Sequence, residues 1–273
     1  MPRIVVDAGH GITSKNGGTQ GYLEHHGMWI LSNYLKAELG KYQNTTVVMT
    51  RSYEKDPSLF ERGQMAKGAD WFVSNHSNAD VAQNTTANGV SVYRSVNRPN
   101  DHATAEALAE TLSKIMGNRN RGAKYAHSSL STPTKPLDLF GVIRSAVGVG
   151  CPHVFLIEHG FHTNLKDERF LLSEENLKRL AQAQADIIAS VLNLKPKEAQ
   201  NMTDELERAP HAWEISGLQW LEENGYLDAG RHKPQEVLTK GLLGVLLKRI
   251  TVDLTVPTIP ERDIKGRIGG ARR

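Results

Sequence analysis

Two histidines of this chain follow short apolar runs, a position from which side chains can bind a metal ion. His10 comes after the run that begins at Ile4, and His76 comes after the run that begins at Trp71. Runs of this length and composition predict buried strands, and the break that follows each run places the next side chain at the strand's carboxyl end. In open α/β sheets, ligands and chemistry collect at that edge. The two imidazoles therefore predict half of a metal site.

Two glutamates are placed to complete this site. Glu24 lies between the two histidine segments, and Glu158 follows the apolar run 154–157. Catalytic zinc sites use three protein ligands and leave a fourth position for water, and two imidazoles with one carboxylate match that set. Such a site also needs a nearby carboxylate that takes up the proton of the attacking water. His10, Glu24 and His76 match the ligand set, and Glu158 is expected at the same edge of the sheet.

The elements that must position these residues alternate between strand and helix. Strands are expected at 4–8, 46–50, 71–74, 89–93, 142–144 and 154–157, and helices at 27–39, 101–115 and 177–192. This alternation is typical of an α/β fold, with a mostly parallel sheet covered by helices on both faces.

Bulk composition narrows the classes of protein that fit. The chain has 273 residues and a formal charge of only +3, with no dense Lys/Arg stripe before the tail, so a nucleic-acid partner is not expected. Its one cysteine, Cys151, excludes an internal disulfide and is interpreted as a small buried residue, not a catalytic thiol. Neither a signal peptide nor a run long enough to span a bilayer is recognised. Synthesis in the cytoplasm, without membrane insertion, is therefore expected.

The composition changes near residue 195. Residues 1–194 carry the α/β pattern, 195–208 are polar and charged as in a linker, and 209–273 predict a small, mainly helical domain with a flexible tail. Trp213, Trp220 and Tyr226 have helical spacing, which favours a two-helix core over a surface that stacks on saccharides.

Four segments carry a resemblance to a known family. They are DAGHG at 7–11, GYLE at 21–24, SNHSNA at 74–79 and LIEHGFHTN at 156–164. In this order they resemble the zinc-dependent N-acetylmuramoyl-L-alanine amidases of the amidase-3 type, over roughly residues 1–193. The resemblance implies a six-stranded α/β fold. It also implies hydrolysis of the amide between the muramic acid lactyl group and L-alanine in peptidoglycan.

The resemblance also assigns roles to individual residues. It implies that His10, Glu24 and His76 bind Zn²⁺, and that Glu158 is the catalytic carboxylate, which moves a proton from the attacking water to the alanine nitrogen. The alternative for Glu158 is a carboxylate that orients a ligand imidazole.

Several other polar residues keep two interpretations. Asn75 stands where an apolar residue is usual in the family, and His159 stands beside Glu158, so both bear on the tuning of the site. Asp7 either orients an imidazole or has a structural role at a strand end. Three arginines are expected in structural ion pairs, the alternative being contacts with stem-peptide carboxylates: Arg51, Arg62 and Arg144.

Peptidoglycan is the partner that these interpretations imply. A wall-cleaving enzyme without a signal peptide predicts a phage endolysin, made in the cytoplasm and acting on the wall after release. A sporulation or autolytic amidase is the alternative, as are a zinc peptidase that cuts within the stem peptide and a non-catalytic wall-binding protein. Glu158 argues against the last, because a binding protein needs no base. Residues 220–227 weakly resemble an S-layer-homology-type unit, so wall binding by 209–273 is a hypothesis. The sequence supports no prediction about self-association.

Overall fold

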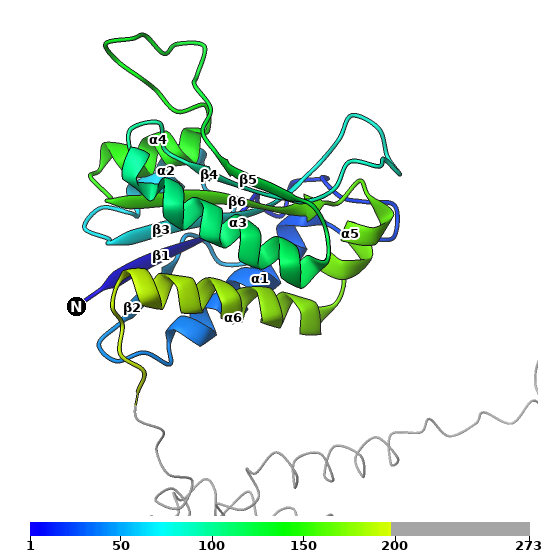
Figure 1. Ribbon diagram of the computed structural model, residues 1–273, viewed down its shortest axis with the longest axis horizontal. Coiled ribbons are helices and arrows are strands. Elements are labelled where there is room, and N and C mark those ends of the chain that lie inside the picture. The colour runs from blue at the N-terminus through cyan, green and yellow to red at the C-terminus, as the bar shows by residue number, and fades with distance from the viewer. Residues whose placement is uncertain (198–273) are drawn as a thin grey trace, which may run out of the picture. The chain divides into compact units, whose positions relative to one another are not determined.

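A six-stranded sheet lies between two layers of helices (Figure 1). The computed structural model describes residues 1–197. The strands are β1 (Arg3–Ala8), β2 (Thr46–Met49), β3 (Trp71–Asn78), β4 (Val90–Arg94), β5 (Asn120–Lys124) and β6 (His153–Phe161). The helices are α1 (Glu24–Leu39), α2 (Leu59–Gln64), α3 (His102–Met116), α4 (Gly141–Gly148), α5 (Leu165–Leu171) and α6 (Glu174–Val191), with a short 3₁₀ helix at Pro99–Asp101.

The strand order is β2-β1-β3-β6-β4-β5. Four of the five neighbouring pairs are parallel, and β4 runs antiparallel to β6. The predicted fold class, a mostly parallel sheet with helices on both faces, is confirmed. The carboxyl ends of β1, β3 and β6 lie side by side, since these three strands are parallel neighbours.

The two faces of the sheet bury different residues. On one face Val73 and Phe155 pack against α1, α3 and α6, the three longest helices. On the other face Phe72 and Leu156 pack against Ile143 of α4 and its neighbours. Successive side chains of a strand alternate between faces. His76 is four residues from Phe72, and Glu158 is two residues from Leu156, so both belong to the face that carries the short helices.

One predicted strand is wrong and one real strand was not expected. Residues 142–144 belong to α4, where Val142, Ile143 and Ala146 share one buried side. The adjacent β-branched residues Val142 and Ile143 favoured a strand. Val142 and Ala146 are four residues apart, however, which also suits one side of a helix, and tertiary packing decides between the two structures. Strand β5 was not predicted because it lies at the edge of the sheet and contributes only Ala123 to the core.

The described residues include no helix with the length and apolarity needed to cross a membrane. Helix α6 ends at Val191. The predicted linker at 195–208 and the predicted domain at 209–273, with Trp213, Trp220 and Tyr226, lie almost wholly outside residues 1–197 and stay predictions.

Candidate metal centre and active site

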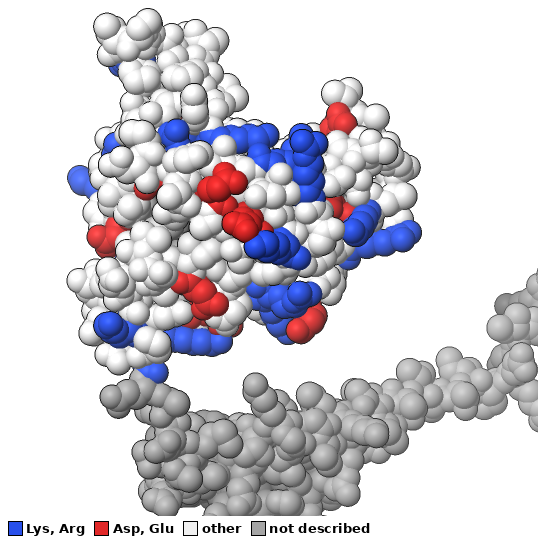
Figure 2. Space-filling view, viewed as in Figure 1, with Lys and Arg blue, Asp and Glu red and all other residues white. Residues whose placement is uncertain are grey.

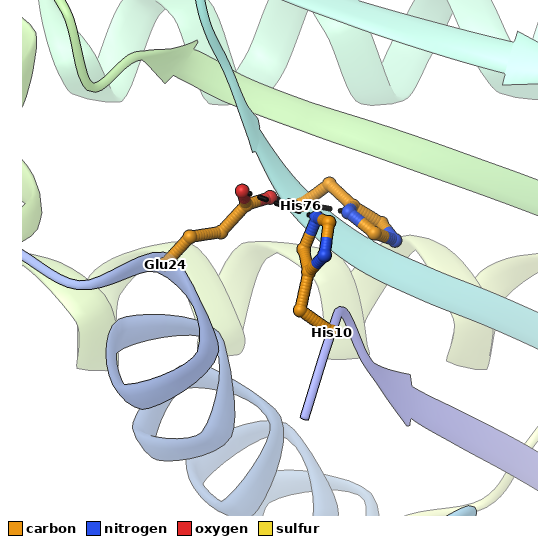
Figure 3. A group of neighbouring side chains, drawn as sticks. All are labelled: His10, Glu24 and His76. Atoms are coloured by element: carbon orange, nitrogen blue, oxygen red, sulfur yellow. Dashed lines mark hydrogen bonds and ion pairs between the residues drawn. The ribbon is translucent and has the colours of Figure 1, made fainter. Parts of the chain in front are cut away.

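The three predicted ligands lie together at the carboxyl edge of the sheet (Figure 3). His10 Nε2 is 3.2 Å from Glu24 Oε2, and His76 Nδ1 is 3.1 Å from Glu24 Oε1. One ligand atom from each residue lies within 4.8 Å of the other two. His10 comes from the loop after β1, Glu24 from the first turn of α1 and His76 from β3. Three distant parts of the sequence thus supply one donor each.

His76 and Glu158 lie on their strands, not after them. The sequence predicted that each follows the end of its strand, but β3 continues to Asn78 and β6 to Phe161. His76 is paired with Glu158 in the parallel register of β3 and β6. The two side chains therefore project from neighbouring positions on the same face.

His10 has the left-handed backbone conformation, with φ of 58°. This region is uncommon for a residue other than glycine, and such outliers gather at functional sites. Arg51 bridges two segments of the backbone near this residue. Its guanidinium donates to the carbonyl oxygens of Ala8 at 3.0 Å and His25 at 2.9 Å. The end of β1 and the first turn of α1 are thereby tied together.

Gly9 lets the chain pass against His76. Its N–H donates to the Asn75 carbonyl oxygen at 2.9 Å. A Cβ at this position would lie 2.5 Å from that oxygen and 2.6 Å from Cε1 of the His76 ring. Only glycine fits here. From the sequence alone, Gly9 was no more than one residue of a glycine-rich loop.

Glu24 is buried and fixed by the backbone around it. Its N–H donates to the Asn16 carbonyl oxygen at 2.9 Å, and its Oε1 accepts from the Ser77 N–H at 3.0 Å. Burial opposes the charged form, but hydrogen bonds from His10 and His76 hold the pKa of Glu24 well below its usual range. The first residue of a helix also favours negative charge. Glu24 is therefore an ionised carboxylate between two imidazoles.

Neighbouring histidines do not join this group. His25 and His26 lie beside Tyr53, with ring centroids 6.3 Å and 5.8 Å from it. Within residues 1–197, His10, Glu24 and His76 are the one group of three such side chains close enough to hold a metal ion. Glu24, and not its neighbours, is the residue brought to the histidines.

Glu158 is a partly buried carboxyl group without a fixed partner. Its Oε2 is inaccessible to solvent and has no hydrogen bond to any described residue. Burial, and then the negative charge of Glu24, raise the pKa of Glu158 to about 8. A carboxyl group poised in this range beside a metal site is suited to accept and return a proton.

His159 and Asn75, the two departures from the family pattern, both face away from Glu158. His159 Nδ1 donates to the His76 carbonyl oxygen at 3.0 Å, and its Nε2 accepts from Gln184 at 3.2 Å. Burial lowers the pKa of His159 to about 4, so the ring is neutral. Asn75 donates to Ser32 Oγ at 3.1 Å. Both side chains therefore form their hydrogen bonds on the face of the sheet opposite Glu158.

Asn16 and Ser77 are site residues that sequence reasoning did not single out. Asn16 Nδ2 lies 3.3 Å from Glu24 Oε2 and 3.4 Å from His10 Nε2. Ser77 Oγ lies 3.2 Å from the Tyr22 hydroxyl and 3.0 Å from His162 Nδ1. Asn16 lies in an irregular loop, where no periodic pattern could indicate its direction.

Asp7 and Arg62 form a buried ion pair on the same face as His76. Arg62 donates through Nε at 2.8 Å and Nη2 at 2.5 Å, and Thr50 and Ser74 donate to the same carboxylate. Burial alone would raise the pKa of Asp7, but the Arg62 charge and these hydrogen bonds lower it. Asp7 therefore has the structural role, and Arg62 forms the predicted ion pair.

The remaining candidates take structural positions. Arg144 donates to the carbonyl oxygens of Asp138 at 2.5 Å and Leu139 at 2.7 Å, so it binds backbone instead of an acid. Arg51 likewise binds carbonyls, as described above. Cys151 is buried in the core, and burial raises the pKa of its thiol to about 12. Such a thiol is not a nucleophile at neutral pH.

Comparison with known proteins gives relatives with related names. N-acetylmuramoyl-L-alanine amidase CwlM of Bacillus licheniformis is 29% identical over 205 residues, which cover 73% of this chain and 72% of the relative. The endolysin of Bacillus phage SPP1 is also 29% identical, over 208 residues that cover 72% of this chain and 69% of the endolysin.

Solved structures agree with these relatives. The catalytic domain of CwlV, an N-acetylmuramoyl-L-alanine amidase of Bacillus (Paenibacillus) polymyxa, has a TM-score of 0.60 at 27% identity. The likeness covers 71% of this chain and all of that one. AmiC2 of Nostoc punctiforme has a TM-score of 0.59 at 27% identity, over 70% of this chain and 97% of AmiC2. Residues 4–190 match the family Amidase_3, described as N-acetylmuramoyl-L-alanine amidase. The chain therefore belongs to this amidase family, and the family and enzyme class that the four segments indicated are confirmed.

Proposed function

We propose that this protein is a zinc-dependent peptidoglycan amidase that cuts the bond between the muramic acid lactyl group and L-alanine. Zn²⁺ would be held by His10, Glu24 and His76, and Glu158 would be the catalytic carboxylate. The observation that carries the proposal is the convergence of three donors beside Glu158, a carboxyl group on the neighbouring strand whose Oε2 has no hydrogen-bond partner among residues 1–197.

The donor set fits zinc. Two imidazoles and one ionised carboxylate are a known catalytic zinc set, and three protein ligands leave one position for water or substrate. When bound, zinc supplies a Lewis acid that polarises the scissile carbonyl and makes water a nucleophile near neutral pH. The Asn16 amide and the Ser77 N–H hold Glu24 in place, as supporting groups do around metal ligands.

Glu158 would move the proton in this reaction. Its carboxylate would take a proton from the attacking water, and the protonated carboxyl would then donate it to the alanine nitrogen as the C–N bond breaks. Since Oε2 has no hydrogen-bond partner among the described residues, no neighbouring donor there holds the carboxyl group in its ionised form. Its register position puts it one strand spacing from His76.

An endolysin role is the favoured biological setting, supported by the similarity to the phage SPP1 endolysin over 69% of that protein. In this setting the chain is made in the cytoplasm and acts on the wall after release. A sporulation or autolytic wall amidase is the second candidate, favoured by the similarity to the Bacillus licheniformis amidase.

Product analysis of digested peptidoglycan tests the reaction. New L-alanine amino groups with intact muramic acid are expected, whereas new termini inside the stem peptide would identify a peptidase. Zinc content should be measured with activity, before chelation, after chelation and after zinc is restored. Full activity in metal-free protein would overturn the zinc proposal. Deletion of residues 195–273 tests the wall-binding hypothesis, since unchanged binding to purified walls would refute it.

A further inference from the structure

A cationic side chain lies on the same face of the sheet as Glu158, two strands away. Ser91 of β4 is paired with Glu158 in the antiparallel register of β4 and β6. Tyr93, two residues further along β4, is paired with Lys124 of β5. Paired residues of neighbouring strands project to one face, and so do residues two apart in one strand. Glu158, Tyr93 and Lys124 therefore share a face.

Arg121 joins Lys124 through an irregularity of β5. The register of β4 and β5 shifts so that Arg121 and Gly122 both lie opposite Ser91. Gly122 has φ of 76°, which glycine adopts readily, and this permits the extra residue. The Arg121 guanidinium then lies 4.8 Å from the ring centroid of Phe161, at the end of β6.

Tyr93 links these cations to the catalytic face. The Lys124 ammonium lies 6.0 Å from the centroid of the Tyr93 ring. Burial raises the pKa of Tyr93, the Glu158 charge raises it further and the Arg121 charge lowers it, so both charges act on the phenol. The two cations and Glu158 therefore border one surface.

Neither cation forms a direct ion pair among residues 1–197: Arg121 donates to the Asn88 carbonyl oxygen at 3.1 Å, and its charge is one of the causes that lower the pKa of Asp80. No ion pair there includes Arg121 or Lys124. Glu106, the acid that contacts β5, instead accepts from the Ala123 N–H at 2.8 Å and from the Asn120 amide. Burial, followed by the charges of Arg121 and Arg119, lowers the pKa of Lys124. Partly buried like charges without a direct ion pair are costly, and a bound anion would relieve that cost.

Basic side chains are visible as a band along β4 and β5. Figure 2 shows the blue atoms on the upper side of the described part, over these strands. Arg94, whose guanidinium lies 4.8 Å from the Tyr125 ring centroid, belongs to the same strand pair. The positive potential along this side would attract an anionic substrate toward the face that holds Glu158.

We propose that Arg121 and Lys124 bind a carboxylate of the stem peptide, on the second or third residue from the muramic acid. The inference rests on the proposed function. Two strand spacings separate Glu158 from β5, roughly 10 Å, and an extended peptide advances about 3.3 Å per residue. A carboxylate two or three residues beyond the scissile amide therefore reaches the two cations. Arginine and lysine are the usual partners of such groups.

Matched soluble muramoyl peptides test this assignment. Each pair differs by one group, a free carboxylate or its carboxamide, at the second residue in one pair and at the third in the other. The wild-type protein is expected to cleave the carboxylate form with a higher kcat/KM, by about ten- to a hundredfold, in at least one pair. In R121Q/K124Q this preference should disappear through a rise in KM, with the carboxamide forms cleaved as before.

Controls separate binding from folding and from general charge. K178Q/R179Q removes two positive charges from α6, on the opposite face, and should keep the preference. R121K/K124R keeps both charges and should keep most of the preference for the carboxylate form. Thermal unfolding midpoints verify that every variant is folded. Equal slowing of both members of each pair by R121Q/K124Q would overturn the proposal, as would a wild type without preference in either pair.

Two further outcomes are distinguishable. Loss of activity by R121Q/K124Q only on walls that carry phosphate polymers, with muramoyl peptides cleaved normally, would assign the cations to those polymers and overturn the stem-peptide assignment. A wild type that cleaves no muramoyl peptide would overturn the proposed function, and the inference with it.

Discussion

His76 and Glu158 are register partners on the parallel strands β3 and β6, so a candidate metal ligand and a candidate proton carrier project side by side from one face. Strand pairing fixes their separation more firmly than two loops would, because both backbones are hydrogen-bonded into the sheet. Such rigid support is what a site needs when water must lie between a metal and a base.

Replacing Glu158 by Gln should abolish catalysis and spare the metal. The amide keeps the shape of the side chain but cannot accept the proton, so kcat is expected to fall at least a hundredfold, within the range of about 10²–10⁴ for general acid–base catalysis. Zinc content and the thermal unfolding midpoint should match the wild type. E175Q, an exposed change on α6, is the control and should retain activity. Substantial activity in E158Q would remove Glu158 from its role.

Replacing Gly9 by Ala should displace His76. The added Cβ would lie 2.5 Å from the Asn75 carbonyl oxygen and 2.6 Å from the His76 ring, so backbone or imidazole must move. Zinc affinity is expected to fall by about tenfold or more, since a displaced ligand weakens the site. Titration with a competing chelator measures this.

The control for that change is Gly148, on α4. A Cβ there has no neighbour within 4 Å, and Ala in place of Gly in a helix stabilises by about 0.5–1 kcal/mol. G148A should therefore bind zinc like the wild type. Equal zinc affinity of G9A and the wild type would show that the chain beside His76 tolerates the extra atom.

Sequence reasoning could predict the parts of this fold that repeat a simple pattern. The runs before His10 and around His76 are buried on both sides, which makes them continuously apolar and easy to recognise. The four motif segments then placed all three candidate ligands and Glu158. The edge strand β5 was missed because it buries little, and with it the cations Arg121 and Lys124, whose spacing only the register shift explains.

The direction of individual side chains was harder to predict. His159 is next to Glu158 in sequence, but alternation along β6 sends it to the other face, where it bonds the His76 carbonyl oxygen. Asn16 reaches Glu24 from an irregular loop. Such contacts depend on the path of a loop in three dimensions, which periodicity does not encode.

Replacing Asp7 by Asn should destabilise the fold by about 3–5 kcal/mol, because it leaves the Arg62 guanidinium buried without a counter-charge. Urea unfolding at pH 7 measures this loss. The exposed Asp186, changed to Asn, is the control for the loss of one charge and should shift stability by less than about 0.5 kcal/mol.

The same carboxylate predicts a pH dependence. Burial opposes its charge, but Arg62 and the hydroxyl donors lower the pKa of Asp7 in the folded protein below its unfolded value of about 3.9. As the pH falls through that value the unfolded chain takes up a proton first, so stability declines toward the lower folded pKa. The contribution of ionised Asp7 to the free energy of unfolding is complete above about pH 5. D7N should lack this part of the acid dependence, and an unchanged acid profile would contradict the lowered pKa.

Replacing Asn16 by Ala should weaken zinc binding without unfolding the chain. The side-chain amide lies 3.3 Å from Glu24 Oε2, and its removal frees that oxygen from its orienting partner, while the Asn16 carbonyl oxygen still accepts from the Glu24 N–H. Loss of such a supporting group typically costs about 10–100-fold in metal affinity. N33A is the matched control. Asn33 also carries a side-chain amide, but it lies on α1 and donates to the Trp29 carbonyl oxygen. If N16A and N33A lower zinc affinity equally, the Asn16 amide does not orient Glu24. If only N16A lowers it, and the unfolding midpoint of metal-free protein is unchanged, the amide acts by orienting the ligands that it contacts, Glu24 and His10.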